Sequence, residues 1–175
     1  MTAVEAYELT TQGGSTDFAR LIRACESFGP YCLIDGLAVN CYVEPVYTLD
    51  ADLVVIAAKL PDLTAHLEAQ SFKTEIHPHS VNAVAPGSDL RIQFTTDERY
   101  QPFPARSVVV SVLGIPVRVA CREDVTQGKR WAYGDRHRRL SKRKKDELDL
   151  IRLAESYPEL KTMYPSELRE QLERG

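Results

Sequence analysis

Two aspartates on a single short apolar segment constrain this chain more than any other feature. Residues 49–57 are predicted to form a buried strand, and side chains alternate along a strand, so Asp50 and Asp52 point to the same side. Two like charges side by side destabilise a sheet unless a positive group lies between them. Carboxylate oxygens suit a divalent cation such as Mg²⁺ or Mn²⁺. The alternative is a surface strand with two solvated aspartates, and the apolar flanking residues argue against it.

A glycine turn lies upstream of this strand. The apolar run 33–38 is interrupted by Asp35 and Gly36 and leads into a predicted helix. A glycine turn that opens a helix can hold phosphate groups on its backbone N–H groups. Together with Asp50 and Asp52, the turn indicates metal-assisted phosphoryl or nucleotidyl transfer.

The charge of the chain is unevenly distributed. Its formal net charge is −3, but residues 129–145 contain nine Lys or Arg residues against the single acid Asp135. A basic block on an acidic body indicates a specific anionic ligand and not general nucleic-acid binding. The four cysteines show no paired spacing, and neither a signal peptide nor a membrane-spanning apolar run is present, so we expect a cytoplasmic protein with reduced thiols.

The hydrophobic pattern predicts strands first and helices later, which is typical of a mixed α/β (α+β) fold: a small mixed sheet flanked by helices, with further helices at the C-terminus. The 175 residues fit one domain with a helical appendage. We expect a loose segment at 1–14, a sheet domain at 15–121 and a helical segment packed on it at 122–175. The predicted strands are 31–34, 49–57, 72–77, 80–85, 89–95, 108–113 and 115–120, and the predicted helices are 15–26, 37–43, 61–70, 123–133, 140–156 and 166–173.

Four motifs in a fixed order resemble those of a known superfamily. They are Gly36-Leu37-Ala38, Thr48-x-Asp50-x-Asp52, Lys129 and the segment 143–149. Over residues 15–160 the chain resembles the DNA polymerase beta-like nucleotidyltransferases, and most closely the AbiEii-type branch of type IV toxin–antitoxin systems. The resemblance implies a nucleotidyltransferase-like fold in which the glycine turn holds nucleotide phosphates. It also implies that two aspartates bind two metal ions with the help of a third carboxylate on a neighbouring strand.

The resemblance also implies a set of site residues and partners. Asp50, Asp52 and Asp146 would be catalytic, and Asp50 and Asp52 would bind Mg²⁺ or Mn²⁺. The phosphate-binding residues would be Gly36, Lys129, Lys142, Arg143 and Lys145. The implied partners are a nucleoside triphosphate, an RNA or protein acceptor and an antitoxin, with no membrane. For the last helix an alternative stays open, in which its charges only form solvated pairs such as Lys142 with Asp146.

Two departures from the family pattern leave two functions open. Asp35 replaces the first residue of the glycine pair, and Gln93 occupies the position expected for the third carboxylate, next to Arg91. An amide is neither an anionic ligand for Mg²⁺ nor a base. The first function is a Mg²⁺-dependent nucleotidyltransferase, acting as a toxin, that transfers a nucleoside monophosphate to RNA or protein. The second is a catalytically degenerate fold that binds a nucleotide, RNA or a partner chain.

Overall fold

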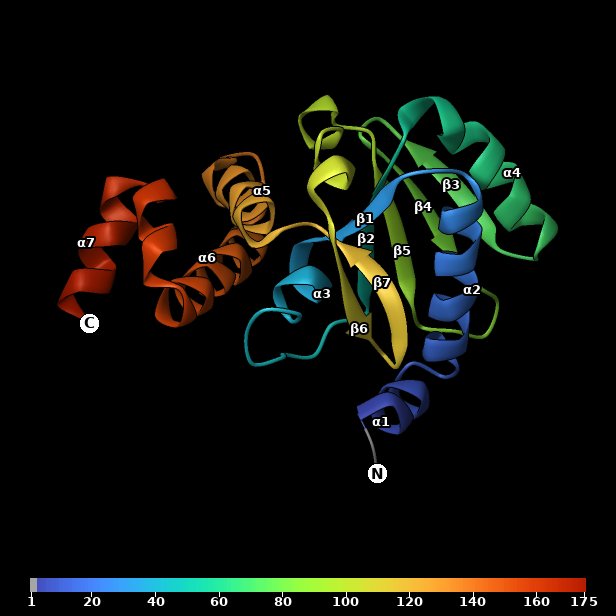
Figure 1. Cartoon of the computed structure of the whole chain (residues 1–175), viewed down its shortest axis with the longest axis horizontal. Helices are drawn as coiled ribbons and strands as arrows, with labels where there is room; N and C mark the ends of the chain where they lie inside the picture. The colour runs from blue at the N-terminus through green and yellow to red at the C-terminus, as the bar shows by residue number, and fades with distance from the viewer. Residues whose placement is uncertain (1–2) are drawn as a thin grey trace.

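A seven-stranded mixed sheet organises the structure, a computed structural model that describes residues 3–175. The strand order is β3-β4-β5-β2-β1-β7-β6 (Figure 1). The strands are β1 Tyr31–Ile34, β2 Asp50–Val55, β3 Lys73–His77, β4 Ser80–Val84, β5 Arg91–Thr95, β6 Val108–Val112 and β7 Ile115–Val119. All seven lie where the sequence predicts strands, and the mixed α+β fold is confirmed.

The middle of the sheet combines parallel and antiparallel pairs. Strand β2 runs antiparallel to β1 and parallel to β5, and β1 runs parallel to β7. The antiparallel hairpins β3-β4 and β6-β7 form the two edges. This register places Asp52 between Ile34 on β1 and Gln93 on β5.

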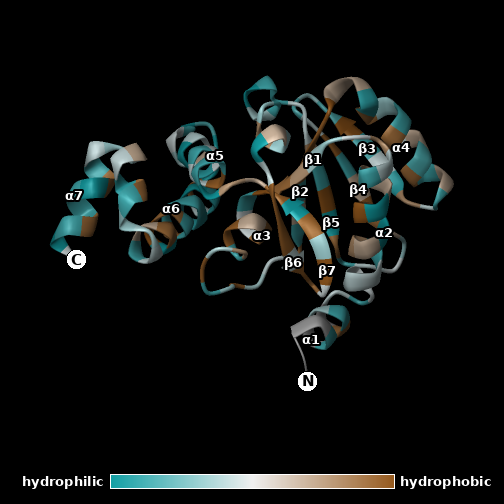
Figure 2. Cartoon of the chain, in the orientation of Figure 1, coloured by the Kyte–Doolittle hydropathy of each residue, from teal (hydrophilic) through white to brown (hydrophobic). Residues whose placement is uncertain are grey.

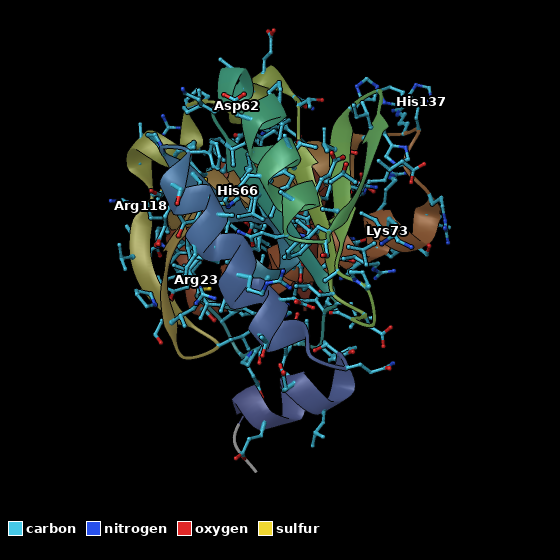
Figure 3. All side chains as sticks on the ribbon, turned by 90° about the vertical axis from the view of Figure 1, so that its right-hand side faces the viewer. Arg23, Asp62, His66, Lys73, Arg118 and His137 are labelled. Atoms are coloured by element: carbon cyan, nitrogen blue, oxygen red, sulfur yellow. The ribbon has the colours of Figure 1, made fainter. Side chains whose placement is uncertain are left out.

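Two helices cover one face of the sheet. Helices α2 and α4 lie side by side over it (Figures 1 and 3). Their apolar residues, such as Phe18 and Leu63, are fully buried, whereas Arg23 and Asp62 point outward (Figure 3). The helices of the chain are α1 Ala3–Thr10, α2 Gly14–Ser27, α3 Asp35–Val39, α4 Leu60–Ala69, α5 Arg122–Gly134, α6 Leu140–Ser156 and α7 Ser166–Arg174.

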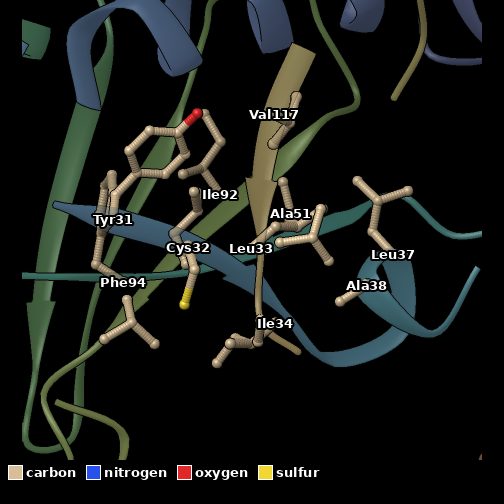
Figure 4. Packing of buried hydrophobic residues seen from close by; sticks show 14 of the residues in the cluster. Tyr31, Cys32, Leu33, Ile34, Leu37, Ala38, Ala51, Ile92, Phe94 and Val117 are labelled. Carbon is tan, nitrogen blue, oxygen red and sulfur yellow. The ribbon is translucent and has the colours of Figure 1, made fainter. Parts of the chain in front are cut away.

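Strand β1 lies at the heart of the core, because all four of its residues are buried. Around it pack Leu37 of α3, Ala51 of β2 and Ile92 of β5 (Figure 4). Burial of apolar surface of this kind contributes about 25 cal/mol per Å² to stability. Figure 2 shows the same division along the chain, with more apolar residues in the sheet than in the predominantly hydrophilic C-terminal helices.

The C-terminal helices lie on the side of the sheet away from α2 and α4 (Figure 1). Both α5 and α6 contact the short helix α3, which directly follows β1. The turn at Asp35 and Gly36 is therefore held between the sheet and the helical segment. This arrangement brings the basic residues of α6 next to the acidic residues of β2.

The N-terminus differs from expectation. The segment 1–14 was expected to be loose, but Ala3–Thr10 forms helix α1, while Met1 and Thr2 lie outside the described residues. Helix α1 packs against α2, and its Glu8 carboxylate accepts hydrogen bonds from the backbone N–H groups of Ser15 (2.8 Å) and Thr16 (3.2 Å). Glu8 of α1 therefore caps the first turn of α2, and these contacts hold in place a helix, α1, whose own sequence has little amphipathic pattern.

All four cysteines are free thiols, and burial raises the pKa of Cys25 and of Cys32. Among the residues that the structure describes, no helix has the length and apolar character needed to span a bilayer.

Candidate functional site

The two aspartates of β2 face a cleft on the sheet face that α2 and α4 leave open. Asp50 and Asp52 both line this cleft, whose volume is about 720 Å³, whereas Ala51 and Leu53 between and after them are fully buried on the other face. The alternation expected for this strand is therefore present. We call this cavity the first cleft. It is lined by residues of the sheet and of the helical segment: Asp35, Asp50, Asp52, Lys73, Thr74, Glu75, Asn82, Ala83, Val84, Arg91, Ile92, Gln93, Arg138 and Lys142.

The neighbouring strand β5 places one residue beside each aspartate. Gln93 lies opposite Asp52, as the sequence predicts, and Arg91 lies opposite Asp50. The Arg91 Nε atom is 2.6 Å from Asp50 Oδ1, and the arginine side chain is 64% exposed. Because it is mostly solvated, Arg91 can leave Asp50 when a stronger cation binds.

The surroundings of Asp52 disfavour its ionised form. Burial raises its pKa well above the usual value, and the nearby carboxylates of Asp35 and Asp50 raise it further. The ammonium groups of Lys129 and Lys145 oppose this shift without cancelling it. The site thus holds three carboxylates close enough to disfavour full ionisation, which a bound cation would relieve.

Asp35 occupies the turn in an unusual backbone conformation. Its φ of 58° lies in the left-handed region, which glycine adopts without strain and other residues rarely adopt. Its carboxylate accepts a hydrogen bond from the Lys129 ammonium group. Burial acts to raise the pKa of Asp35, but the charge and hydrogen bond of Lys129, together with the charges of Arg138 and Lys145, outweigh it and the net shift is downward. The contact with Lys129 therefore compensates for an acid in a position suited to glycine.

Lys129 lies at the centre of a buried ionic network. Its Nζ atom is 3.0 Å from Asp146 Oδ1 and 2.8 Å from Asp149 Oδ2, and it also contacts Asp35. The side chains of Lys129, Asp146 and Asp149 are each no more than 2% exposed. Burial opposes the charge on Lys129, but its three carboxylate partners outweigh that effect and raise its pKa. The lysine stays charged and fills the space among three acids whose oxygens lie within 4.8 Å of one another.

This network determines where two of the predicted site residues lie. Asp146 is almost wholly inaccessible, and Lys129 reaches only a small pocket of about 110 Å³ that also contacts Asp35 and Asp52. Neither residue lies at the surface of the first cleft. Helix α6 is therefore more than a set of solvated charge pairs, because its inner face supplies Asp146 and Asp149 to Lys129.

The other predicted phosphate-binding residues divide into two groups. Lys142 lines the first cleft, and Lys145 lies beside the turn, since a Cβ atom on Gly36 would be 3.9 Å from Lys145 Nζ. Arg143 instead donates a hydrogen bond from Nε to the backbone carbonyl of Tyr133, at 3.2 Å. The structure thus brings Gly36, Lys142 and Lys145 to the site and turns Arg143 toward the end of α5.

The sequence does not predict that Arg138 belongs to the site. Arg138, in the connection between α5 and α6, lines the first cleft and donates a hydrogen bond from Nε to Asp146 Oδ2 at 2.8 Å. In the sequence it is one of nine basic residues in the block 129–145, and nothing distinguishes it from its neighbours Arg136 and Arg139.

Comparison with known proteins supports the fold assignment. No protein-family model matches the chain, and no curated protein sequence matches it. The architecture is that of nucleotidyltransferase-like proteins. The solved structure of ANT(2")-Ia in complex with adenylyl-2"-tobramycin matches with a TM-score of 0.61 and 16% identity, over 91% of this chain and 97% of that one.

Two further structures match at similar levels. An antigenic nucleotidyltransferase-like protein from Paracoccidioides brasiliensis matches with a TM-score of 0.55 and 20% identity, over 92% of this chain and 86% of that one. JHP933 from Helicobacter pylori matches with a TM-score of 0.53 and 18% identity, over 83% and 68% of the two chains. This chain therefore has a nucleotidyltransferase-like fold.

Proposed function

We propose that this protein is a Mg²⁺-dependent nucleotidyltransferase that transfers a nucleoside monophosphate from a nucleoside triphosphate to an RNA or protein acceptor. The observation that carries the proposal is the pair Asp50 and Asp52, which face a cleft large enough for a nucleotide beside two basic side chains of α6. Ligand sites of small molecules have volumes of this order, about 300–1,000 Å³.

The residues present fit a divalent cation. Asp50 and Asp52 offer carboxylate oxygens on one face of the sheet, and Gln93 offers an amide oxygen beside them. Oxygen donors of this kind suit Mg²⁺ or Mn²⁺. Burial, and after it the carboxylates of Asp35 and Asp50, raise the pKa of Asp52, so a cation beside it would favour its ionised form. When bound to these aspartates, the ion would supply charge neutralisation to the reacting phosphates.

The phosphates of the nucleotide would lie between the turn and α6. We assign their contacts to Gly36, Lys142 and Lys145, because the lysine side chains lie at the cleft and at the turn. Lys129 and Asp146 then act indirectly, because Lys129 binds Asp35 at the start of α3 and Asp146 binds Lys129. In this arrangement they are positioning residues, and charge-assisted hydrogen bonds to the phosphates come from α6.

A second candidate function rests on Gln93 and Arg91. With an amide beside Asp52 and a guanidinium on Asp50, the chain would bind a nucleotide, RNA or a partner without turnover. The role as a toxin of the AbiEii-type branch, held by an antitoxin partner, rests on the resemblance of the sequence motifs and applies to either candidate.

Label transfer separates the two functions. The purified protein is incubated with each α-labelled nucleoside triphosphate, Mg²⁺ and either total RNA or a mixture of proteins. Transfer of label by the wild type, lost in Asp50→Asn/Asp52→Asn, supports the enzyme. Nucleotide binding without transfer to any acceptor supports the binding module. Absence of both binding and transfer contradicts both.

A further inference from the structure

A second, larger cleft meets the first one near Asp52. The second cleft has a volume of about 930 Å³, and its lining includes Gln93, Arg99, Tyr100, Trp131, Ala132 and Arg138. The small pocket of about 110 Å³ lies between the two clefts, since it shares Asp35 and Asp52 with the first cleft and Tyr100 and Ala132 with the second. Two side chains line all three cavities, those of Gln93 and Arg138.

Aromatic side chains form one wall of the second cleft. Trp131 stacks on Phe103 at a ring separation of 5.9 Å, and Tyr100 packs edge-on against both rings. The guanidinium of Arg99 covers the Trp131 ring at 4.7 Å. The ring faces of Trp131 are thus already engaged within the protein, and the tryptophan acts as a packing anchor. Gln93 and Arg138 are the lining residues of the second cleft that also line the first cleft.

The buried ionic network holds Arg138 in place. Its Nε atom donates to Asp146, and Asp146 is held in turn by Lys129, so the arginine is tied to the buried network. Among the described residues, Nε is the one side-chain nitrogen of Arg138 that makes a hydrogen bond, so both terminal amino groups are available toward the cavities. The side chain is 34% exposed, which leaves it accessible to a ligand and still restrained.

The surroundings of Arg138 favour its charged form. Burial acts to lower its pKa, but Asp146 and Asp35 outweigh this effect, and Asp52 adds to the upward shift. A planar guanidinium with one anchored nitrogen and two free amino groups can present two parallel donors to a phosphate.

We propose that Arg138 is a catalytic residue of the transfer reaction, and that its guanidinium contacts the phosphoryl group in transit where the two clefts meet. This inference rests on the proposed nucleotidyl transfer. A transfer between two substrates requires both to reach one phosphorus atom. With the triphosphate in the first cleft beside Asp50 and Asp52, the acceptor reaches that atom from the second cleft.

The acceptor hydroxyl oxygen attacks the α-phosphorus and forms a new P–O bond, while the bond from that phosphorus to the bridging oxygen of the β-phosphate breaks. Pyrophosphate leaves with the electron pair, and the hydroxyl proton is released to solvent. Negative charge shifts among the phosphate oxygens during this displacement, and a preorganised cation aimed at those oxygens stabilises the transition state.

The test compares Arg138→Ala and Arg138→Lys with Arg136→Ala. Arg136 lies in the same connection and is exposed, but it lines none of the three cavities. We expect Arg138→Ala to lower kcat about 100-fold or more, which is the range for loss of one transition-state donor. Nucleoside triphosphate affinity should change by less than about threefold, because the contact tightens only in the transition state. Arg136→Ala should keep wild-type kcat.

Two further readouts separate catalysis from structure. Free guanidinium ion should restore part of the activity of Arg138→Ala, which a misfolded variant would not regain. Arg138→Lys keeps the charge and should retain more activity than Arg138→Ala, although it loses the paired donors. A normal kcat in Arg138→Ala, a loss confined to KM, or an equal loss in Arg136→Ala would overturn the inference while leaving the proposed function intact. Wild-type protein that transfers nothing to any acceptor would overturn the proposed function and, with it, the inference.

Discussion

Gln93 lies directly opposite Asp52 in the parallel pair of β5 and β2, on the sheet face that lines the first cleft. A carboxylate at this position would complete a triad of acids with Asp50 and Asp52, and an amide cannot bind a cation as an anion or accept a proton. The neighbouring acid that most affects Asp52 is instead Asp35, on the turn after β1. In the proposed transferase, the acids near Asp52 are therefore Asp50 on β2 and Asp35, which is already paired with Lys129.

Gln93→Asp should raise nucleotidyl transfer at least about tenfold, because a positioned base typically contributes about a hundredfold or more. Nucleotide affinity should change little. The matched control is Asn82→Asp, since Asn82 is the partner of Gln93 on β4, lines the same cleft and lies one strand further from Asp52. It should give no gain. Fully active wild type together with a neutral or harmful Gln93→Asp would show that another acid, such as Asp35, already does this work.

Mn²⁺ should raise the melting temperature of the wild type and not that of Asp50→Asn/Asp52→Asn. At about 100 times its Kd a ligand stabilises the folded state by about 2.7 kcal/mol. Glu75→Gln serves as the control, because Glu75 lines the same cleft from β3 without neighbouring the two aspartates in the sheet. That variant should respond to Mn²⁺ like the wild type. The same thermal response in all three proteins would remove Asp50 and Asp52 as metal ligands.

Lys129→Met should lower the free energy of unfolding by about 3–5 kcal/mol, the range for removing one partner of a buried ion pair. Methionine has a similar length but leaves Asp35, Asp146 and Asp149 without their shared cation. Chemical denaturation measures the loss. The control is Lys144→Met on α6, because the Lys144 side chain is 66% exposed and water can replace its ammonium beside Glu147, so its loss should matter little. Equal stability of the two variants would contradict the structural role of Lys129.

The sequence alone predicts the sheet and the position of Gln93 because those features depend on local alternation. The period of two in residues 49–57 fixes which side Asp50 and Asp52 face, and the same pattern in 89–95 brings Gln93 to that side, beside Asp52. Helix α6 was predicted with the same bounds as observed, 140–156, because its apolar residues repeat with helical spacing and Pro158 follows its end.

The ionic network could not be predicted in the same way. Lys129 finds one partner on α3 and two on α6, and these contacts depend on how α5 and α6 dock, which no local pattern encodes. From sequence, the resemblance marks Lys129 as a phosphate-binding residue, and Arg138 is only one member of the basic block 129–145. The fold buries the first and leaves the second at the junction of the clefts. Helix α1 was missed for a related reason, since contacts with α2 hold it in place.

The raised pKa of Asp52 leads to a prediction for the metal-free protein. An acid with a raised pKa in the folded state binds its proton more tightly there than in the unfolded chain, where the pKa is about 3.9. The stability that this proton contributes is fully present below the unfolded value and is lost as the pH rises through the folded value. Ionised Asp52 then repels Asp35 and Asp50 at neutral pH.

Asp52→Asn should therefore be more stable than the wild type at about pH 8 in EDTA, and its advantage should shrink toward about pH 4, where the wild-type carboxyl is protonated. Melting temperatures measured across this range in EDTA provide the check. Saturating Mn²⁺ is the internal control, because it should reverse the order at high pH by stabilising the wild type alone. A stability difference that is constant with pH in EDTA would contradict the crowding of carboxylates around Asp52, and with it the physical reason for a cation at this site.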